Sequence, residues 1–126
     1  MNKPAPNDAV LATPAEVEES DQVFDSAAEL FRLLATPIRL KIISSLCGQE
    51  KNVSQLLGEI DTTQPNMSQH LHTLYQSGVL GKRREGVQIF YRIINDNVVT
   101  LCRAVCTQIA IEGDPRSIGA SLKTGK

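Results

Sequence analysis

The stretch that decides the fold runs from Thr62 to Gly78 and reads TTQPNMSQHLHTLYQSG. Four apolar residues recur at the spacing i, i+4, i+7 and i+8 of one helix face. They are Met67, Leu71, Leu74 and Tyr75. Pro65 suits a first helical turn, Thr62 or Thr63 can cap it, and Gly78 suits the left-handed residue after a helix. The stretch therefore predicts one well-bounded helix.

The rest of this helix surface is polar without charge. An ordinary solvated face carries Lys and Glu, whereas this one carries amide, hydroxyl and imidazole groups and no carboxylate. Asn and Gln pair with adenine edges, and Ser pairs with phosphates or bases. The candidate DNA-reading residues are Gln64, Asn66, Ser68, Gln69 and His72.

The neighbouring segments predict a winged helix-turn-helix. Val53–Ile60 is typical of a short helix capped by Ser54, and a tight turn leads from it into the polar helix. Two β-prone runs, 79–84 and 87–93, flank the turn pair Glu85-Gly86, which predicts a hairpin. Three cations expected at its tip are suited to phosphate contact. They are Lys82, Arg83 and Arg84.

Four blocks resemble the ArsR/SmtB family of bacterial dimeric repressors. They are Leu34–Ile43, Gln64–Leu71, Ser77–Leu80 and Arg83–Tyr91, in the family's order and spacing within residues 23–111. The resemblance implies a mainly α fold with a β-hairpin wing, a dimer formed through the first and last helices, and repression of operator DNA until an effector binds.

Composition fits this class. The 126 residues are 41% hydrophobic and 21% charged, which predicts one globular domain over residues 13–112, a disordered tail over 1–12 and a flexible tail over 113–126. No apolar run approaches the ~20 residues of a membrane span, and the start lacks a signal-peptide core. We therefore expect a cytoplasmic protein without a membrane partner.

The formal net charge of −1 argues at first against DNA binding. Its distribution reverses that argument. Between Thr62 and Ile93 four cations face a single carboxylate, Glu85, whereas residues 1–35 hold two cations against seven carboxylates. Positive charge is concentrated where the DNA-binding motif needs it.

Three further helices flank the motif. A first helix can begin at the capping-box pattern Thr13-Pro14 or near Ser20, and its broad apolar face suits either a dimer interface or an ordinary core. A second begins at Thr36-Pro37 and ends at Gly48. The last is capped within Asn95–Asn97, carries an apolar stripe and is broken at Gly113.

Three cysteines are the candidate sensing residues: Cys47, Cys102 and Cys106. Thiols in the cytoplasm are usually free, and small buried cysteines are common, so a core role is the alternative. Cys102 and Cys106 lie one turn apart, which strains a direct disulfide but suits two thiolates on a soft ion. The confinement of all three cysteines to two predicted helices favours a reactive or ligand-binding role over a core role.

Comparison with the family's effector sites excludes its known metal sites. The positions of the zinc-type site hold Asn95, Asn97, Gln108 and Ile111, and amides are poor zinc ligands. Gln55–Leu57 replaces the Cys-x-Cys pair of the arsenic and cadmium type. His70 and His72 are not spaced as a ligand pair and suit DNA contact or packing. No cofactor is expected.

A branch of the family that senses persulfides and oxidants places its two cysteines at the positions of Ser44 and Ala110. Cys47 lies about one turn after the first position and Cys106 about one turn before the second. If these helices pack antiparallel, both shifts move the pair together along the contact. The resemblance thus implies a thiol pair displaced by one turn.

The leading hypothesis is a homodimeric repressor that leaves its operator when these cysteines react with reactive sulfur or an oxidant, which would be its small thiol-reactive inducer. The alternative inducer is arsenite or a soft metal held by all three thiolates. A thiol enzyme is disfavoured because no Cys-x-x-Cys motif and no base beside a thiol are evident. An interaction module without DNA binding is disfavoured because the polar helix face is intact.

Overall fold

The computed structural model describes residues 20–113, and the chain divides into two compact units between Ala35 and Thr36. Within residues 20–113, no helix is both long and apolar enough to cross a membrane. The pattern Thr13-Pro14 and both predicted tails, apart from Gly113, lie outside the described residues.

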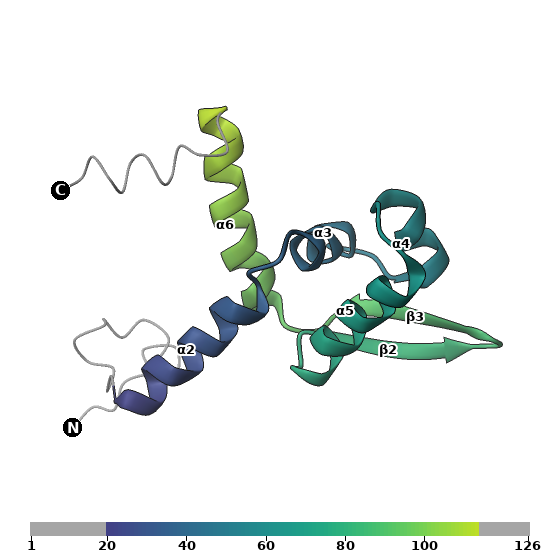
Figure 1. Ribbon diagram of the computed structural model, residues 1–126, viewed down its shortest axis with the longest axis horizontal. Helices are drawn as coiled ribbons and strands as arrows, with labels where there is room; N and C mark the ends of the chain where they lie inside the picture. The colour runs from purple at the N-terminus through teal and green to yellow at the C-terminus, as the bar shows by residue number, and fades with distance from the viewer. Residues whose placement is uncertain (1–19, 114–126) are drawn as a thin grey trace, which may run out of the picture. The chain divides into compact units, whose positions relative to one another are not determined.

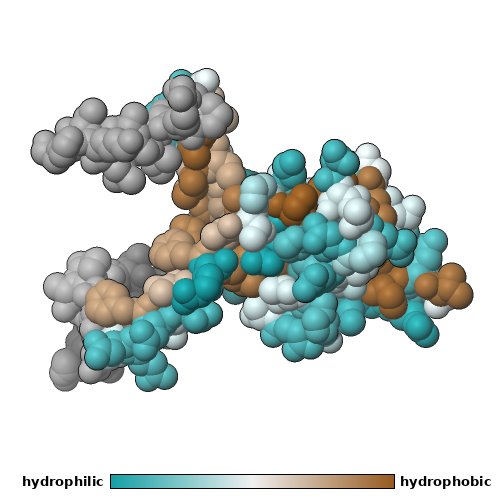
Figure 2. Space-filling model, viewed as in Figure 1, coloured by the Kyte–Doolittle hydropathy of each residue, from teal (hydrophilic) through white to brown (hydrophobic). Residues whose placement is uncertain are grey.

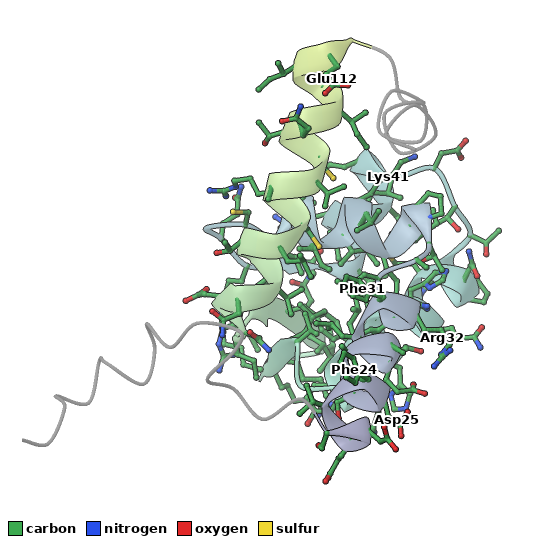
Figure 3. The ribbon with its side chains drawn as sticks, turned by 90° about the vertical axis from the view of Figure 1, so that its left-hand side faces the viewer. Phe24, Asp25, Phe31, Arg32, Lys41 and Glu112 are labelled. Atoms are coloured by element: carbon green, nitrogen blue, oxygen red, sulfur yellow. The ribbon has the colours of Figure 1, made fainter. Side chains whose placement is uncertain are left out.

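The first unit contributes helix α2, Asp21–Leu33. Ser20 caps it by accepting a hydrogen bond from the backbone N–H of Val23, so the start expected near Ser20 is confirmed. None of the thirteen residues is buried within the chain, and Phe24 and Phe31 are 57% and 59% exposed. Figure 3 shows these two phenylalanines on one side of α2 and Arg32 on another.

The second unit begins with three helices (Figure 1). They are α3, Pro37–Ser45, α4, Val53–Glu59, and α5, Gln64–Gln76. Thr36 caps α3, with Pro37 in its first turn, and Thr63 caps α5, with Pro65 in its first turn. Both agree with the sequence-based prediction. The predicted cap of α4 is wrong. Asn52 caps it instead and forms a reciprocal capping box with Gln55, which satisfies two backbone donors that Ser54 cannot reach.

The wing is a hairpin of β2, Leu80–Glu85, and β3, Gln88–Ile93. Glu85 pairs with Gln88, so the turn consists of Gly86 and Val87, one residue later than predicted. Gly86 takes φ +65°, which a glycine adopts without strain. A third strand that the sequence does not predict, β1 at Lys51–Asn52, pairs with Phe90 and Tyr91 in the middle of β3 and makes the sheet order β1-β3-β2.

The core lies among α3, α4, α5 and the base of the wing. Its fully buried members come from each of these elements. They are Ile42, Ile43 and Leu46, Leu56, Met67, Leu71 and Leu74, and Val79 and Leu80. Tyr75 is an exception to the predicted apolar face of α5, because it is 37% exposed and its ring lies 4.4 Å beneath the ammonium of Lys82.

The last helix, α6, spans Asp96–Glu112 and packs against α3. Asn95 caps its start and Gly113, at φ +75°, ends it, both as predicted. Its stripe is less buried than expected: Val98 is the one buried residue of the helix, and Val105 is 41% exposed. Figure 2 shows apolar surface along α6 and mostly hydrophilic surface over α4, α5 and the wing.

Candidate functional site

The polar face of α5 is open to solvent. All five candidate reading residues are exposed, while Met67, Leu71 and Leu74 fix the opposite side of the helix in the core. The amide of Asn66 donates to Thr62 Oγ1 at 2.8 Å, so it is engaged in closing the helix start. Gln64, Ser68, Gln69 and His72 therefore form the open part of this surface.

His70 does not belong to that surface. Its Nδ1 lies 3.1 Å from the guanidinium of Arg39 on α3, and the ring is half-buried. Burial, reinforced by the nearby positive charge of Arg39, lowers the pKa of His70. A neutral ring can accept a hydrogen bond from Arg39 at Nδ1, so this contact joins α3 to the reading helix.

The three wing cations differ in what they contact. Lys82 lies over Tyr75, and Arg83 pairs with Glu50 and, at 3.0 Å, with Glu85. The hydrogen bond to Arg83 is the main cause of the lowered pKa of the Glu50 carboxyl. Arg84 is paired opposite Ile89, one step from the turn, and is exposed. Only part of the cationic group thus lies at the tip.

A cavity of about 280 Å³ lies between α3 and α6, and all three cysteines line it. Cys47 comes from the turn after α3, whereas Cys102 and Cys106 come from α6. Ser44 and Ala110, the positions that correspond to the thiols of the persulfide branch, line the same cavity. Cys47, from the turn after α3, and both cysteines of α6 thus share one surface with the two positions of the persulfide branch.

The three thiols have different surroundings. Cys47 and Cys102 are partly buried, Cys106 is exposed, and all three are free. Burial, with a smaller effect of Cys106, raises the pKa of the Cys102 thiol. Cys47 Sγ lies 2.5 Å from Nη2 of Arg103, a residue that no sequence motif marks.

No metal site is preformed in residues 20–113: nowhere there do three or more His, Cys, Asp or Glu side chains gather closely enough to hold an ion. Two positions of the family's zinc-type site have other contacts. Asn95 accepts from the backbone N–H of Asn97, and Gln108 donates to Glu112 at 2.5 Å. Leu56, within the segment that replaces the Cys-x-Cys pair, is fully buried.

Comparison with known proteins agrees with this architecture. Residues 36–82 match the family described as "Bacterial regulatory protein, arsR family". The biofilm growth-associated repressor of Agrobacterium fabrum is 38% identical over 78 residues, 62% of this chain and 67% of that protein. The transcriptional repressor BigR of Xylella fastidiosa superposes with a TM-score of 0.64 at 33% identity, over 69% of this chain and 89% of that chain. This chain belongs to the ArsR family.

Another solved structure shares the fold and extends the comparison. The homodimeric winged helix-turn-helix DNA-binding domain of Mb0332 from Mycobacterium bovis has a TM-score of 0.61 and 28% identity, over 76% of this chain and 91% of that domain. Some curated ArsR relatives are matched over 54% to 57% of their own length. These relatives are DNA-binding regulators rather than enzymes, so the exclusion of a thiol enzyme and the predicted winged fold are both confirmed.

Proposed function

We propose that this ArsR-family repressor is a cytoplasmic homodimer that leaves its operator when thiols of the cavity between α3 and α6 react with a small electrophilic inducer. The observation that carries the proposal is the convergence of Cys47, Cys102 and Cys106 on one cavity from two separate elements. Three small core cysteines would be expected to be buried and dispersed, whereas these line an opening and one is exposed.

The proposed DNA contacts follow from the reading helix and the wing. Gln64, Ser68 and Gln69 are exposed on α5 and offer hydrogen-bonding groups to base edges, with Asn66 and His72 beside them. Lys82, Arg83 and Arg84 would meet phosphates of the adjacent groove, which adds affinity without sequence preference. Arg84 requires no rearrangement for this role, whereas Arg83 must exchange its carboxylate partners.

Unburied apolar residues on both terminal helices support a dimer. Val23, Phe24 and Phe31 of α2 and Val105 and Ile111 of α6 are all more than 40% exposed within the chain. Large apolar surfaces of this kind are typical of interfaces. The related domain of Mb0332 is homodimeric. In a dimer, two reading helices about 34 Å apart would enter successive major grooves.

The proposed switch uses the position of the cavity between α3 and α6. A reagent that links a thiol of α6 to Cys47, directly or through added sulfur atoms, would pull α6 against the end of α3. Because α6 would also lie in the dimer interface, a small shift there changes the spacing of the two reading helices. Operator affinity then falls although neither reading helix changes its own structure.

Operator binding and intact mass, measured together, test this proposal. The wild-type protein and single Cys→Ser variants are exposed separately to polysulfide, peroxide, arsenite and Zn(II). We expect polysulfide or peroxide to add mass to the wild type and release it from DNA, and Cys47→Ser to prevent release. Release of the triple Cys→Ser protein by the same reagent would refute thiol sensing.

The arsenite experiment decides the alternative inducer. A trigonal arsenic site needs three sulfur ligands, so every single Cys→Ser variant would lose the response to arsenite. If Cys47 and Cys106 are needed and Cys102 is not, a two-thiol sulfur or oxidant sensor is favoured.

A further inference from the structure

Arg103 has an unusual partner for an exposed arginine. Its guanidinium contacts the sulfur of Cys47, and within residues 20–113 it forms no ion pair with a carboxylate. Arg83 and Arg32, by contrast, pair with glutamates. An arginine side chain is always charged. Its contact with Cys47 therefore puts a permanent positive charge beside one of the three cysteines.

The position of Arg103 on α6 places that charge at the shared cavity. Arg103 follows Val99 by four residues and precedes Cys106 by three, so these side chains lie on the same face of the helix. All three line the cavity, together with Cys47 and Cys102. A small molecule in the cavity therefore meets a cation and a thiol at the same place.

We propose that Arg103 is the positioning residue that makes Cys47 the attacking thiol and that draws anionic reagents to it. This inference rests on the proposed function, because it assigns the order of events in the same cavity. A thiolate, not a thiol, is the nucleophile, and a neighbouring guanidinium stabilises its negative charge. The same charge attracts a reagent that carries a negative charge.

The first step then has a defined balance of atoms and electrons. The sulfur of Cys47 attacks one sulfur of a polysulfide or disulfide reagent, a new S–S bond forms, and the reagent's own S–S bond breaks. The leaving sulfur departs with the electron pair as a thiolate. A cysteine of α6 then attacks the Cys47 sulfur of this mixed disulfide, a new S–S bond joins the two cysteines, and the second fragment of the reagent leaves with the electron pair. Two protein thiols are thereby oxidised, and the reagent is reduced to two thiol or sulfide fragments.

The surroundings of the other cysteines agree with this order. Burial raises the pKa of Cys102, which disfavours its thiolate and makes it a poorer first nucleophile. Cys106 is exposed and lies on the same face of α6 as Arg103, while the guanidinium is directed to Cys47. Cys106 is therefore placed to resolve the mixed disulfide.

Alkylation rates with two reagents of similar size and different charge test the inference. Iodoacetamide is neutral and iodoacetate is an anion; in each case the thiolate forms a C–S bond and iodide leaves with the C–I electron pair. Rates at Cys47 are measured by mass at neutral pH in a Cys102→Ser/Cys106→Ser background. The variants compared are Arg103→Gln, Arg103→Lys and, as a matched exposed arginine, Arg32→Gln.

We expect Arg103→Gln to slow alkylation of Cys47 by iodoacetamide about fivefold and by iodoacetate about twentyfold, because only the anion also loses attraction. Arg103→Lys should stay within about twofold of the parent, since it keeps the charge. Arg32→Gln should change neither rate. High salt should reduce the difference between the two reagents in the parent protein.

Equal rates in the parent and Arg103→Gln, or a slowing that is the same for both reagents and for Arg103→Lys, would overturn the inference. If Arg103→Gln does not fold, the parent protein still gives the answer, because a difference between the two reagents that high salt leaves unchanged would also overturn the inference. If the predicted rates are found but no thiol reagent releases the wild-type protein from its operator, the role of Arg103 stands and the proposed switch fails.

Discussion

Helices α5 and α6 both carry apolar stripes at helical spacing, yet the chain treats them differently. Met67, Leu71 and Leu74 of α5 are fully buried, packed against α3, α4 and β2. Of the seventeen residues of α6 only Val98 is buried. The apolar face of the reading helix is thus buried by its own chain, whereas α6 lines the thiol cavity on one side and leaves apolar residues exposed.

This difference shows that a stripe identifies a face and does not identify what covers it. A helix fixed on one side by a dense core presents its other side in a constant orientation, which suits the recognition of base edges. A helix with little burial can shift at low cost, which suits a helix that responds to a ligand.

Alanine substitutions in the two stripes should have very unequal effects on stability. Leu71→Ala leaves a cavity in the core and is expected to lower the free energy of unfolding by about 2–5 kcal/mol. Val105→Ala removes partly exposed surface and should cost less than about 1 kcal/mol. Urea denaturation at low protein concentration measures both. A Val105→Ala cost equal to that of Leu71→Ala would contradict the comparison.

The open side of α5 should govern operator affinity. Gln64→Ala and Ser68→Ala are each expected to weaken operator binding by about 1–3 kcal/mol through lost contacts, without changing the unfolding transition. Gln76→Ala, at an exposed position in the last turn of the same helix, is the matched control. If Gln64→Ala and Ser68→Ala bind like the control, α5 does not read DNA.

Two adjacent wing arginines, Arg83 and Arg84, should differ in how much each contributes to DNA affinity. Arg84→Ala should weaken specific and random DNA alike and lower the salt slope by about one unit. Arg83→Ala should have a smaller effect, because phosphate contact by Arg83 first requires loss of its pairs with Glu50 and Glu85. Binding isotherms at several salt concentrations measure both slopes. A larger effect of Arg83→Ala would show that the exchange of partners is easy.

The smallest expected effect concerns the link between α3 and α5. The pKa of His70 is lowered below its ordinary value of 6.5, so on acidification the unfolded chain takes up this proton before the folded chain does. The stability gained by keeping His70 neutral is complete above pH 6.5. It is lost as pH falls below 6.5 and through the lowered pKa of the folded state. Urea midpoints at neutral and mildly acidic pH should fall less in His70→Gln than in the wild type. An identical pH dependence in His70→Gln and the wild type would exclude His70 as a source of the pH-dependent stability.

The sequence predicts those features that depend on local chemistry. The Thr36 cap, a threonine cap on α5, the left-handed Gly78 and the end of α6 at Gly113 follow from residue types at fixed offsets, and the hairpin follows with its turn one residue later than predicted. It does not predict β1, because two residues carry no periodicity and pair only with a distant strand. The contact of Arg103 with Cys47 joins residues 56 positions apart and leaves no local pattern.

The short strand β1 joins the wing to the start of α4. It pairs only with Tyr91 and Phe90, and Asn52, which also caps α4, donates through its side chain to Gln88 at 3.0 Å. Contacts of Asn52 therefore reach the last strand pair before the turn, Glu85 with Gln88, and only Gly86 and Val87 lie beyond it. The same residue caps α4, so we expect the wing and the start of α4 to move as one rigid piece when Arg84 meets a phosphate.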